Sequence, residues 1–251
     1  MTDDTQTTND PIDAFEYLTN HGCNDQRSEV RCIEPVSDLH DCTNLWIRFF
    51  SSLEDLSPLA SLKNLRSLSL QDCTSLKDLT PLASMTNLHN LVLAQCTGIL
   101  DLSPLERLTS LTYLNLNKCT GIIDFTPLSK LTNLTTLELA MCQTLTDLSV
   151  LKDLTKLETL SLFHGRRINY LSPLSNLKQL TELNLWGCLF VEDISPLAEL
   201  PNLKHLILKS CRRVKDVSPL EGKVSLKRVN LAATGIDLES LTPALRAKLY
   251  R

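Results

Sequence analysis

The residues with the greatest capacity for chemistry are one set of serine, histidine and glutamate and the nine cysteines. A hydrolytic triad could be drawn from Ser161, His164 and Glu138, because a histidine can take the serine proton while a carboxylate orients the imidazole. The cysteines could bind a metal ion, form disulfides or fill a core as small apolar groups. Which chemistry is available depends on the elements that position these side chains.

The spacing of the cysteines shows a repeat of 23 residues. The positions of this series that lack cysteine hold Phe50, Gly165 and Thr234. A Leu-x-Leu pair precedes each position, and this alternation predicts a short strand with one buried face. The cysteines on the series are Cys73, Cys96, Cys119, Cys142, Cys188 and Cys211. One structural unit therefore recurs about nine times.

A second recurring segment, DLSPL at 55–59 and again at 101–105, predicts the start of a short helix. Its Ser or Thr would accept a hydrogen bond from a first-turn amide as the N-cap, and proline follows where a missing N–H costs nothing. Leucines such as Leu59 and Leu62 would then face inward. A coil of one strand and one such turn cannot bury its apolar side alone, so successive coils must stack.

The sequences LRSLSLQDC (65–73) and TNLTTLELAMC (132–142), each joined to a DLSPLxxL-type segment, resemble the leucine-rich repeat family. The resemblance covers 33–236, and the return segment is similar to the short-repeat subclass of phosphatase-regulatory and internalin-type proteins. That subclass usually has a repeat one residue shorter and Asn in place of Cys. The resemblance implies an α/β solenoid, a right-handed arc with a parallel sheet on the concave side and short helical or 3-10 turns on the convex side.

Both ends of the chain are predicted to cap this stack. A first helix would begin at Asp10 and Pro11, and a last helix at Thr242 and Pro243. Such caps keep the open ends of a solenoid soluble. The expected order is a disordered tail (1–9), an N-terminal cap with a short helix (10–32), about nine coils (33–236) and a C-terminal capping helix (237–251).

These elements argue against the chemistries named first. A straight row of thiols does not supply a tetrahedral metal site, and parallel Cβ vectors disfavour disulfides between stacked coils, so the cysteines are expected to be core residues. An open concave sheet offers Ser161, His164 and Glu138 neither a pocket nor an oxyanion site. We expect no enzymatic activity, no metal and no cofactor.

The composition gives no general attraction to nucleic acid or anionic membrane. The net charge is −4, the pI is about 5.7, and no apolar run approaches the length that crosses a bilayer. The N-terminus MTDDTQTTND is polar and acidic, unlike a signal peptide. The sequence therefore predicts a cytoplasmic location.

The repeat fails in one region, where Gly165 replaces the cysteine, Tyr170 an aspartate and Val150 a proline. Aromatic and apolar side chains near it are bracketed by two arginine pairs, and this combination is typical of an interface core and its rim. Local inconsistency of this kind tends to mark functional sites. The predicted binding residues are Phe163, His164, Arg166, Arg167, Trp186, Leu189, Phe190, Lys209, Arg212 and Arg213, with Glu138 on the concave face and Trp46 on the first strand.

Purely structural roles are the alternative for the same residues. Gly165 could merely relax the corner, Leu189 and Phe190 could tuck against a neighbouring loop, and the arginines could be an ordinary solvated rim. The N-terminal cap could cover Trp46.

The sequence thus predicts a non-enzymatic protein-binding module, an inhibitor, immunity-type protein or adaptor, whose partner has an acidic or mixed surface. One alternative is nucleic-acid binding through the aromatic and arginine patch, although Glu138, Glu182 and Asp72 on the concave face count against it. Another is a secreted-effector-type binder of host proteins. Neither a membrane nor a small-molecule substrate is an expected partner.

Overall fold

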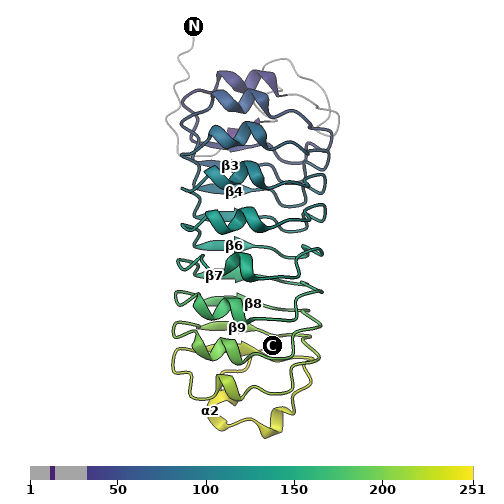
Figure 1. The fold of residues 1–251 in the computed structure, drawn as a ribbon, viewed down its shortest axis with the longest axis vertical. Coiled ribbons are helices and arrows are strands. Elements are labelled where there is room, and N and C mark those ends of the chain that lie inside the picture. The colour runs from purple at the N-terminus through teal and green to yellow at the C-terminus, as the bar shows by residue number, and fades with distance from the viewer. Residues whose placement is uncertain (1–11, 15–32, 251) are drawn as a thin grey trace.

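The computed structural model describes residues 12–14 and 33–250, which form a curved stack of coils (Figure 1). Within these residues one parallel sheet runs from β1 to β10 in the order of the sequence. Each strand pairs with the next in the same register, as Leu68 does with Leu91. The strands are β1 (Ile12–Asp13), β2 (Asn44–Trp46), β3 (Ser67–Ser69), β4 (Asn90–Val92), β5 (Tyr113–Asn115), β6 (Thr136–Glu138), β7 (Thr159–Ser161), β8 (Glu182–Asn184), β9 (His205–Ile207) and β10 (Arg228–Asn230).

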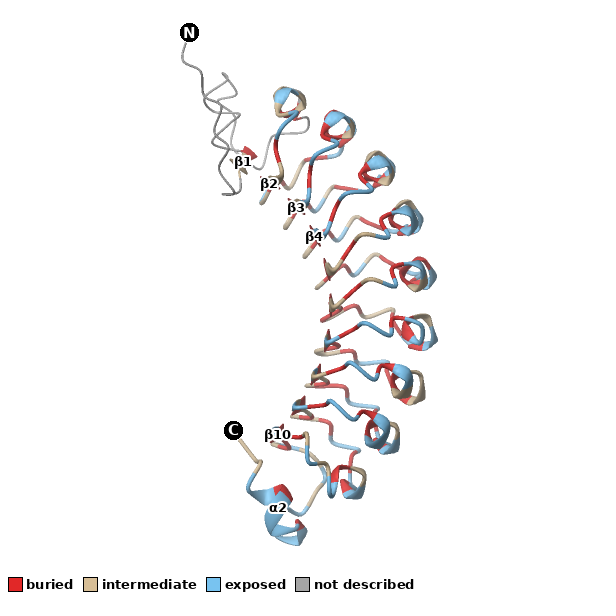
Figure 2. Cartoon of the chain, turned by 90° about the vertical axis from the view of Figure 1, so that its left-hand side faces the viewer, coloured by how far each residue is buried: buried red, intermediate tan, exposed pale blue. Residues whose placement is uncertain are grey.

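The return segments form 3-10 helices on the opposite side of the stack. Figure 2 shows the strands along the inner, concave side of the arc and these helices along its outer side. They are η1 (Glu34–Asp38), η2 (Ser57–Ser61), η3 (Thr80–Ser84), η4 (Ser103–Arg107), η5 (Thr126–Lys130), η6 (Ser149–Leu151), η7 (Ser172–Asn176), η8 (Ser195–Glu199), η9 (Ser218–Leu220) and η10 (Leu238–Ser240). The sequence-based expectation of a solenoid arc with a parallel concave sheet is confirmed.

The helix starts differ from the expectation that Ser or Thr would be the N-cap. In η2, Ser57 is the first helical residue, and the residue before it makes no side-chain cap. Instead Asp55 accepts both the Ser57 N–H at 2.7 Å and the Ser57 hydroxyl at 2.9 Å. Asp101 and Ser103 repeat this arrangement. The carboxylate two residues upstream is therefore the capping group, and serine is its donor.

The core is one continuous apolar column through the stack. Leu68, Leu70 and Leu82 are fully buried, and the equivalent positions of neighbouring coils are buried with them. The cysteine series belongs to this core, and each thiol donates to a carbonyl of the preceding coil, as Cys96 does to Leu70 at 2.9 Å and Cys119 to Leu93 at 2.9 Å. Burial raises the pKa of Cys119 to about 12. The thiols are thus structural donors in a dry environment.

The residue before each cysteine position has a left-handed backbone, which turns the chain out of the strand. Asp72 has φ 63°, Lys118 has φ 60° and His164 has φ 55°. Gly187, with φ 75°, is the one glycine in this column of the described coils. Left-handed conformations cost a side-chain-bearing residue about 1–2 kcal/mol, so the packing of the coils must hold the other members in place.

The first strand corrects the predicted start of the N-terminal helix. Ile12 and Asp13 are extended and pair with Leu45 and Trp46 of β2, so the helix cannot run through them from Pro11. Most of the predicted cap and the whole of the 1–9 tail lie outside the described residues. At the other end, α2 (Pro243–Arg246) follows Thr242, whose hydroxyl accepts the Leu245 N–H at 3.4 Å, and Leu245 is buried against the last coil.

Candidate functional site

The candidate site lies where the chain leaves three neighbouring strands, β7, β8 and β9. These strands pair in register, so residues that occupy the same place in successive coils become neighbours in space. A surface hollow of about 540 Å³ forms there, which we call the basic hollow. It is lined by His164, Arg166, Trp186, Gly187, Leu189, Phe190, Ser210, Arg212 and Arg213.

The floor of the basic hollow depends on Gly187. A Cβ at this position would lie 3.1 Å from Cδ2 of the His164 ring and 3.2 Å from Cγ and Nε2. The absence of a side chain therefore allows the imidazole to lie directly against the backbone of the next coil. The same glycine adopts the left-handed conformation of its column without the usual steric penalty.

An aromatic cluster forms one wall. The Phe163 ring meets the Trp186 ring edge to face, with centroids 5.0 Å apart, and meets the His164 ring with centroids 4.3 Å apart. The backbone N–H of Trp186 donates to the side-chain oxygen of Asn184 at 3.0 Å. This hydrogen bond fixes the backbone where the strand ends. Phe163 does not line the basic hollow, but it supports two residues that do.

Cations lie over the aromatic rings at two places. The Lys209 ammonium is 4.3 Å from the Trp186 ring centroid, and the Arg213 guanidinium carbon is 4.6 Å from the Phe190 centroid. Cation–π contacts of this kind hold the cationic groups beside the hollow while their N–H donors stay available. No hydrogen bond or ion pair joins the side chains of Lys209 or the site's arginines to any residue that the structure describes.

The two residues that follow each cysteine position form the rim pair of that coil. In the earlier coils the rim pairs are small or polar: Thr74 and Ser75, Thr97 and Gly98, Thr120 and Gly121, Gln143 and Thr144. The three coils of the site carry Arg166 and Arg167, Leu189 and Phe190, Arg212 and Arg213. Leu189 is 36% exposed and Phe190 44% exposed. Among the coils from 33 to 236, these three are the ones whose rim pairs include both bulky apolar side chains and paired guanidinium groups.

The structure brings together most of the residues predicted from the sequence. Seven of the twelve line the basic hollow, and Phe163 and Lys209 contact its wall. Arg167 is exposed on the same rim but does not line the hollow. Sequence reasoning missed Gly187 and Ser210, although a lone glycine in a column of larger residues was a readable signal.

Two predicted residues lie elsewhere. Glu138, on β6, pairs in register with Ser161 and is half-buried on the concave face, outside the hollow. Trp46 lies on β2 between Asp13 and Ser69, far along the sheet, with the Arg48 guanidinium carbon 4.1 Å from its ring centroid. The predicted N-terminal cap that could cover Trp46 is mostly outside the described residues.

The groups with catalytic potential are not arranged for catalysis. Ser161 is 8% exposed, and no hydrogen bond links it to His164 or Glu138. In the described part of the chain, no cluster of His, Cys, Asp and Glu side chains could hold a metal ion. None of the described helices is long and apolar enough to span a bilayer. The chemistry that the site offers is recognition by aromatic faces and guanidinium donors.

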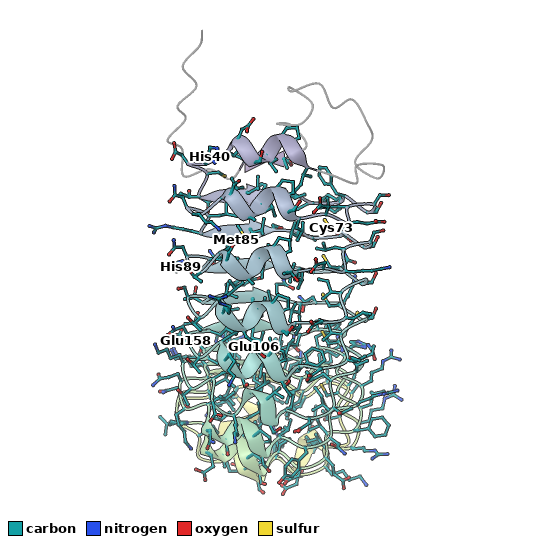
Figure 3. All side chains as sticks on the ribbon, turned by 45° about the horizontal axis from the view of Figure 1, so that its top comes forward. His40, Cys73, Met85, His89, Glu106 and Glu158 are labelled. Atoms are coloured by element: carbon teal, nitrogen blue, oxygen red, sulfur yellow. The ribbon has the colours of Figure 1, made fainter. Side chains whose placement is uncertain are left out.

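A second hollow of about 320 Å³ is lined by Asn64, Arg66, Asn87 and His89. Figure 3 shows His89 on the flank of the stack opposite Cys73, and therefore opposite the cysteine corners that border the basic hollow. Its groups serve the fold, because Asn87 donates to the Lys63 carbonyl at 3.1 Å and Asn64 donates to the His40 carbonyl at 3.1 Å.

An arc of stacked coils with an open concave face defines a solenoid of repeats. The chain belongs to the leucine-rich repeat family, since a family model described as Leucine Rich repeats (2 copies) matches 63–107, 109–153 and 155–199, more than half of the residues. Within that family it is of the internalin type. Proteins of this type are generally protein-interaction scaffolds without enzymatic activity.

Solved structures of two internalins from Listeria monocytogenes are similar to this chain. Internalin C2 is 37% identical, with 70% of this chain and 75% of that chain covered and a TM-score of 0.65. The internalin InlF is 27% identical, with 87% and 69% covered and a TM-score of 0.65. A TLR13–ssRNA13 complex, at 22% identity, 86% and 32% coverage and a TM-score of 0.65, shares the fold. No curated protein sequence matches the chain.

Proposed function

We propose that the chain binds another protein through the concave face and rim of its last coils and acts as an inhibitor, immunity-type protein or adaptor without catalysing a reaction. The observation that carries this proposal is the basic hollow, where aromatic rings lie beside Arg166, Arg212 and Arg213. Arg167 lies on the same rim and Lys209 lies over the Trp186 ring, and none of these five cations is paired with a described carboxylate. The whole chain is acidic, so this concentration of positive charge is local.

The side chains present are those that contribute most in protein interfaces. Tryptophan and arginine are enriched among residues whose loss weakens binding most, and an apolar centre with a charged rim is the usual arrangement. Exposed Leu189 and Phe190 would lose contact with water on binding. The arginines favour a partner with an acidic or mixed surface, because complementary charge raises the association rate.

The proposal is tested by affinity capture from the source lysate with the wild type and a Phe163→Ala/Trp186→Ala/Phe190→Ala variant, quantified by mass spectrometry. A matched control replaces three exposed apolar residues elsewhere, Leu100→Ala/Ile123→Ala/Val224→Ala. Circular dichroism verifies that both variants fold. We expect at least one protein to be lost with the site variant and kept with the control. Equal recovery with all three baits would contradict the proposal.

The same cation and aromatic pairs also favour a second candidate, stacking of single-stranded nucleic acid bases. Treating the lysate with nuclease before capture separates the two. A protein partner that survives the treatment supports protein binding. Loss of every site-dependent partner on treatment, with steep salt dependence of binding to a single-stranded RNA, would favour nucleic acid instead.

A further inference from the structure

We infer that the basic hollow receives an extended acidic segment of the partner, with two carboxylates three residues apart and one bulky apolar side chain between them. The inference rests on the proposed function that this surface binds protein. It adds the direction of the segment, along the solenoid axis, and the spacing of its charges.

The first argument is the order of the rim pairs. Arg166 and Arg167 belong to the coil of β7, and Arg212 and Arg213 to the coil of β9. Between them, in the coil of β8, lie Leu189 and Phe190. The rim therefore reads basic, apolar, basic along the axis, and a complementary ligand must read acidic, apolar, acidic.

The second argument is the distance between the basic coils. Neighbouring strands of a sheet are about 4.8 Å apart, so two steps from β7 to β9 place equivalent residues about 10 Å apart. An extended chain advances about 3.3–3.6 Å per residue, and three residues therefore span about 10 Å. In the polyproline II form of an extended chain, which has three residues per turn and rises about 3.1 Å per residue, side chains at positions i and i+3 lie on the same face. Carboxylates at these two positions therefore match both arginine pairs at once.

The third argument is that the arginine donors are free to receive carboxylates. Two exposed cations elsewhere in the molecule have acidic partners, Lys178 in Glu199 at 3.4 Å and Arg246 in Glu239 at 3.4 Å. The site's arginines have no such partner among the described residues. Stacking on Phe190 holds the Arg213 guanidinium plane, and a planar fork suits two-point binding of a carboxylate.

The fourth argument is the middle of the hollow. Its volume of about 540 Å³ is bounded by Trp186, Phe190 and Leu189, with the His164 ring lying on Gly187 below them. An aromatic or large aliphatic side chain between the two carboxylates would contact these groups. The hollow thus accounts for the apolar residue, and the flanking arginines account for the charges.

The experiment uses fluorescein-labelled peptides titrated into the full chain and read by fluorescence polarisation. The matching peptide is Gly-Ser-Glu-Phe-Ala-Glu-Ser-Gly, and a peptide of the same composition with adjacent carboxylates is Gly-Ser-Glu-Glu-Phe-Ala-Ser-Gly. Two further peptides replace both glutamates by lysine, or the phenylalanine by alanine. We expect the matching peptide to bind about tenfold more tightly than the lysine peptide and about threefold more tightly than the other two.

Two variants of the chain locate the effect. Arg166→Ala/Arg212→Ala should weaken the matching peptide about tenfold and remove its advantage over the peptide with adjacent carboxylates. The control variant Arg107→Ala/Lys130→Ala removes two exposed cations from the convex helices η4 and η5. It should leave unchanged both the affinity for the matching peptide and the advantage of that peptide over the one with adjacent carboxylates.

The inference is overturned if the wild type binds the two glutamate peptides with equal affinity. It is also overturned if the lysine peptide binds as tightly as the matching peptide. These results differ from failure of the proposed function, which would appear as equal lysate capture by the wild type and the aromatic variant. Site-dependent capture of a protein together with no spacing preference would leave the proposed function standing and refute the extended acidic segment.

Discussion

The His164 imidazole lies against the backbone of Gly187, close enough that a Cβ on residue 187 would be 3.1 Å from Cδ2 of the ring. The two residues occupy the same left-handed position of successive coils, with φ 55° and φ 75°. One coil therefore supplies a ring and the next supplies the space for it. This pairing shapes the floor of the basic hollow.

Gly187→Ala should reduce partner binding at the hollow, while its loss of folding stability should be no larger than that of a glycine replaced elsewhere. The new methyl group displaces the His164 ring by a few tenths of an ångström, and the left-handed backbone adds about 1 kcal/mol of strain. Gly222→Ala is the matched control, because Gly222 has φ 70° and nothing within 4 Å of a Cβ. Urea unfolding should give similar losses for both variants, while only Gly187→Ala reduces partner capture. Equal partner capture by the two variants would show that the position of the His164 ring does not affect binding.

Leu139→Ala should lower the free energy of unfolding much more than Trp186→Ala does, because Leu139 is a core residue and Trp186 lies at the surface. Leu139 is 1% exposed inside the stack, so its truncation should cost about 2–5 kcal/mol. Because coils contact only their neighbours, that loss should spread to adjacent coils in hydrogen exchange. Trp186 is half-buried and meets Phe163 edge to face, so Trp186→Ala should cost about 1 kcal/mol. A Trp186→Ala loss as large as that of Leu139→Ala would place the indole in the core.

The repeat made much of the fold and site predictable, because equal coils turn a spacing of 23 residues into spatial adjacency. That rule alone placed Phe163 beside Trp186 and the two arginine pairs on either side of Leu189. Glu138 and Trp46 share the concave face but belong to other coils, so they lie outside the basic hollow.

The remaining features depend on contacts that a residue pattern does not encode. The capping group of η2 is Asp55 and not Ser57, because the turn before the helix brings the carboxylate back to the Ser57 N–H. Ile12 and Asp13 are extended because they pair with β2, which overrides the helix-start signal of Asp10 and Pro11. The role of Gly187 follows from the His164 ring of another coil.

The buried thiols should make the protein sensitive to alkali. Burial raises the pKa of Cys119, Cys142, Cys188 and Cys211 from the ordinary 9.0 to about 12. The native state therefore keeps protons that the unfolded chain releases, so this stability is complete below pH 9 and is lost as pH rises toward 12. The loss is at most about 1.4 kcal/mol per pH unit for each thiol.

The measurement is the free energy of unfolding in urea under reducing conditions, at several values from about pH 8 to about pH 11. Cys119→Ala/Cys142→Ala is the comparison variant, and its stability should fall less steeply because two of the titrating thiols are gone. Parallel slopes for the wild type and the variant would show that the thiols do not carry the alkaline sensitivity.

Tyr170→Asp should stabilise the protein, because it restores the capping carboxylate that its coil lacks. In the coil before, Asp147 accepts the Ser149 N–H at 2.8 Å and the Ser149 hydroxyl at 2.6 Å. Tyr170 holds the equivalent position before η7 and is 64% exposed, so its ring leaves little packing to lose. A gain of about 0.5–1 kcal/mol in urea unfolding is expected at neutral pH.

The pH dependence identifies the cause of that gain. The pKa of Asp147 is lowered by hydrogen bonds from the Ser149 side chain and backbone, so such a carboxylate stabilises the fold above its ordinary pKa of 3.8 and loses this effect as pH falls through the lowered value. The gain from Tyr170→Asp should vanish in acid in the same way. Tyr170→Asn, which can accept the same N–H without ionising, should show a smaller gain with no such pH dependence. If Tyr170→Asp instead destabilises the protein, the phenol ring supports the coil of the basic hollow and the repeat departs from aspartate there for packing.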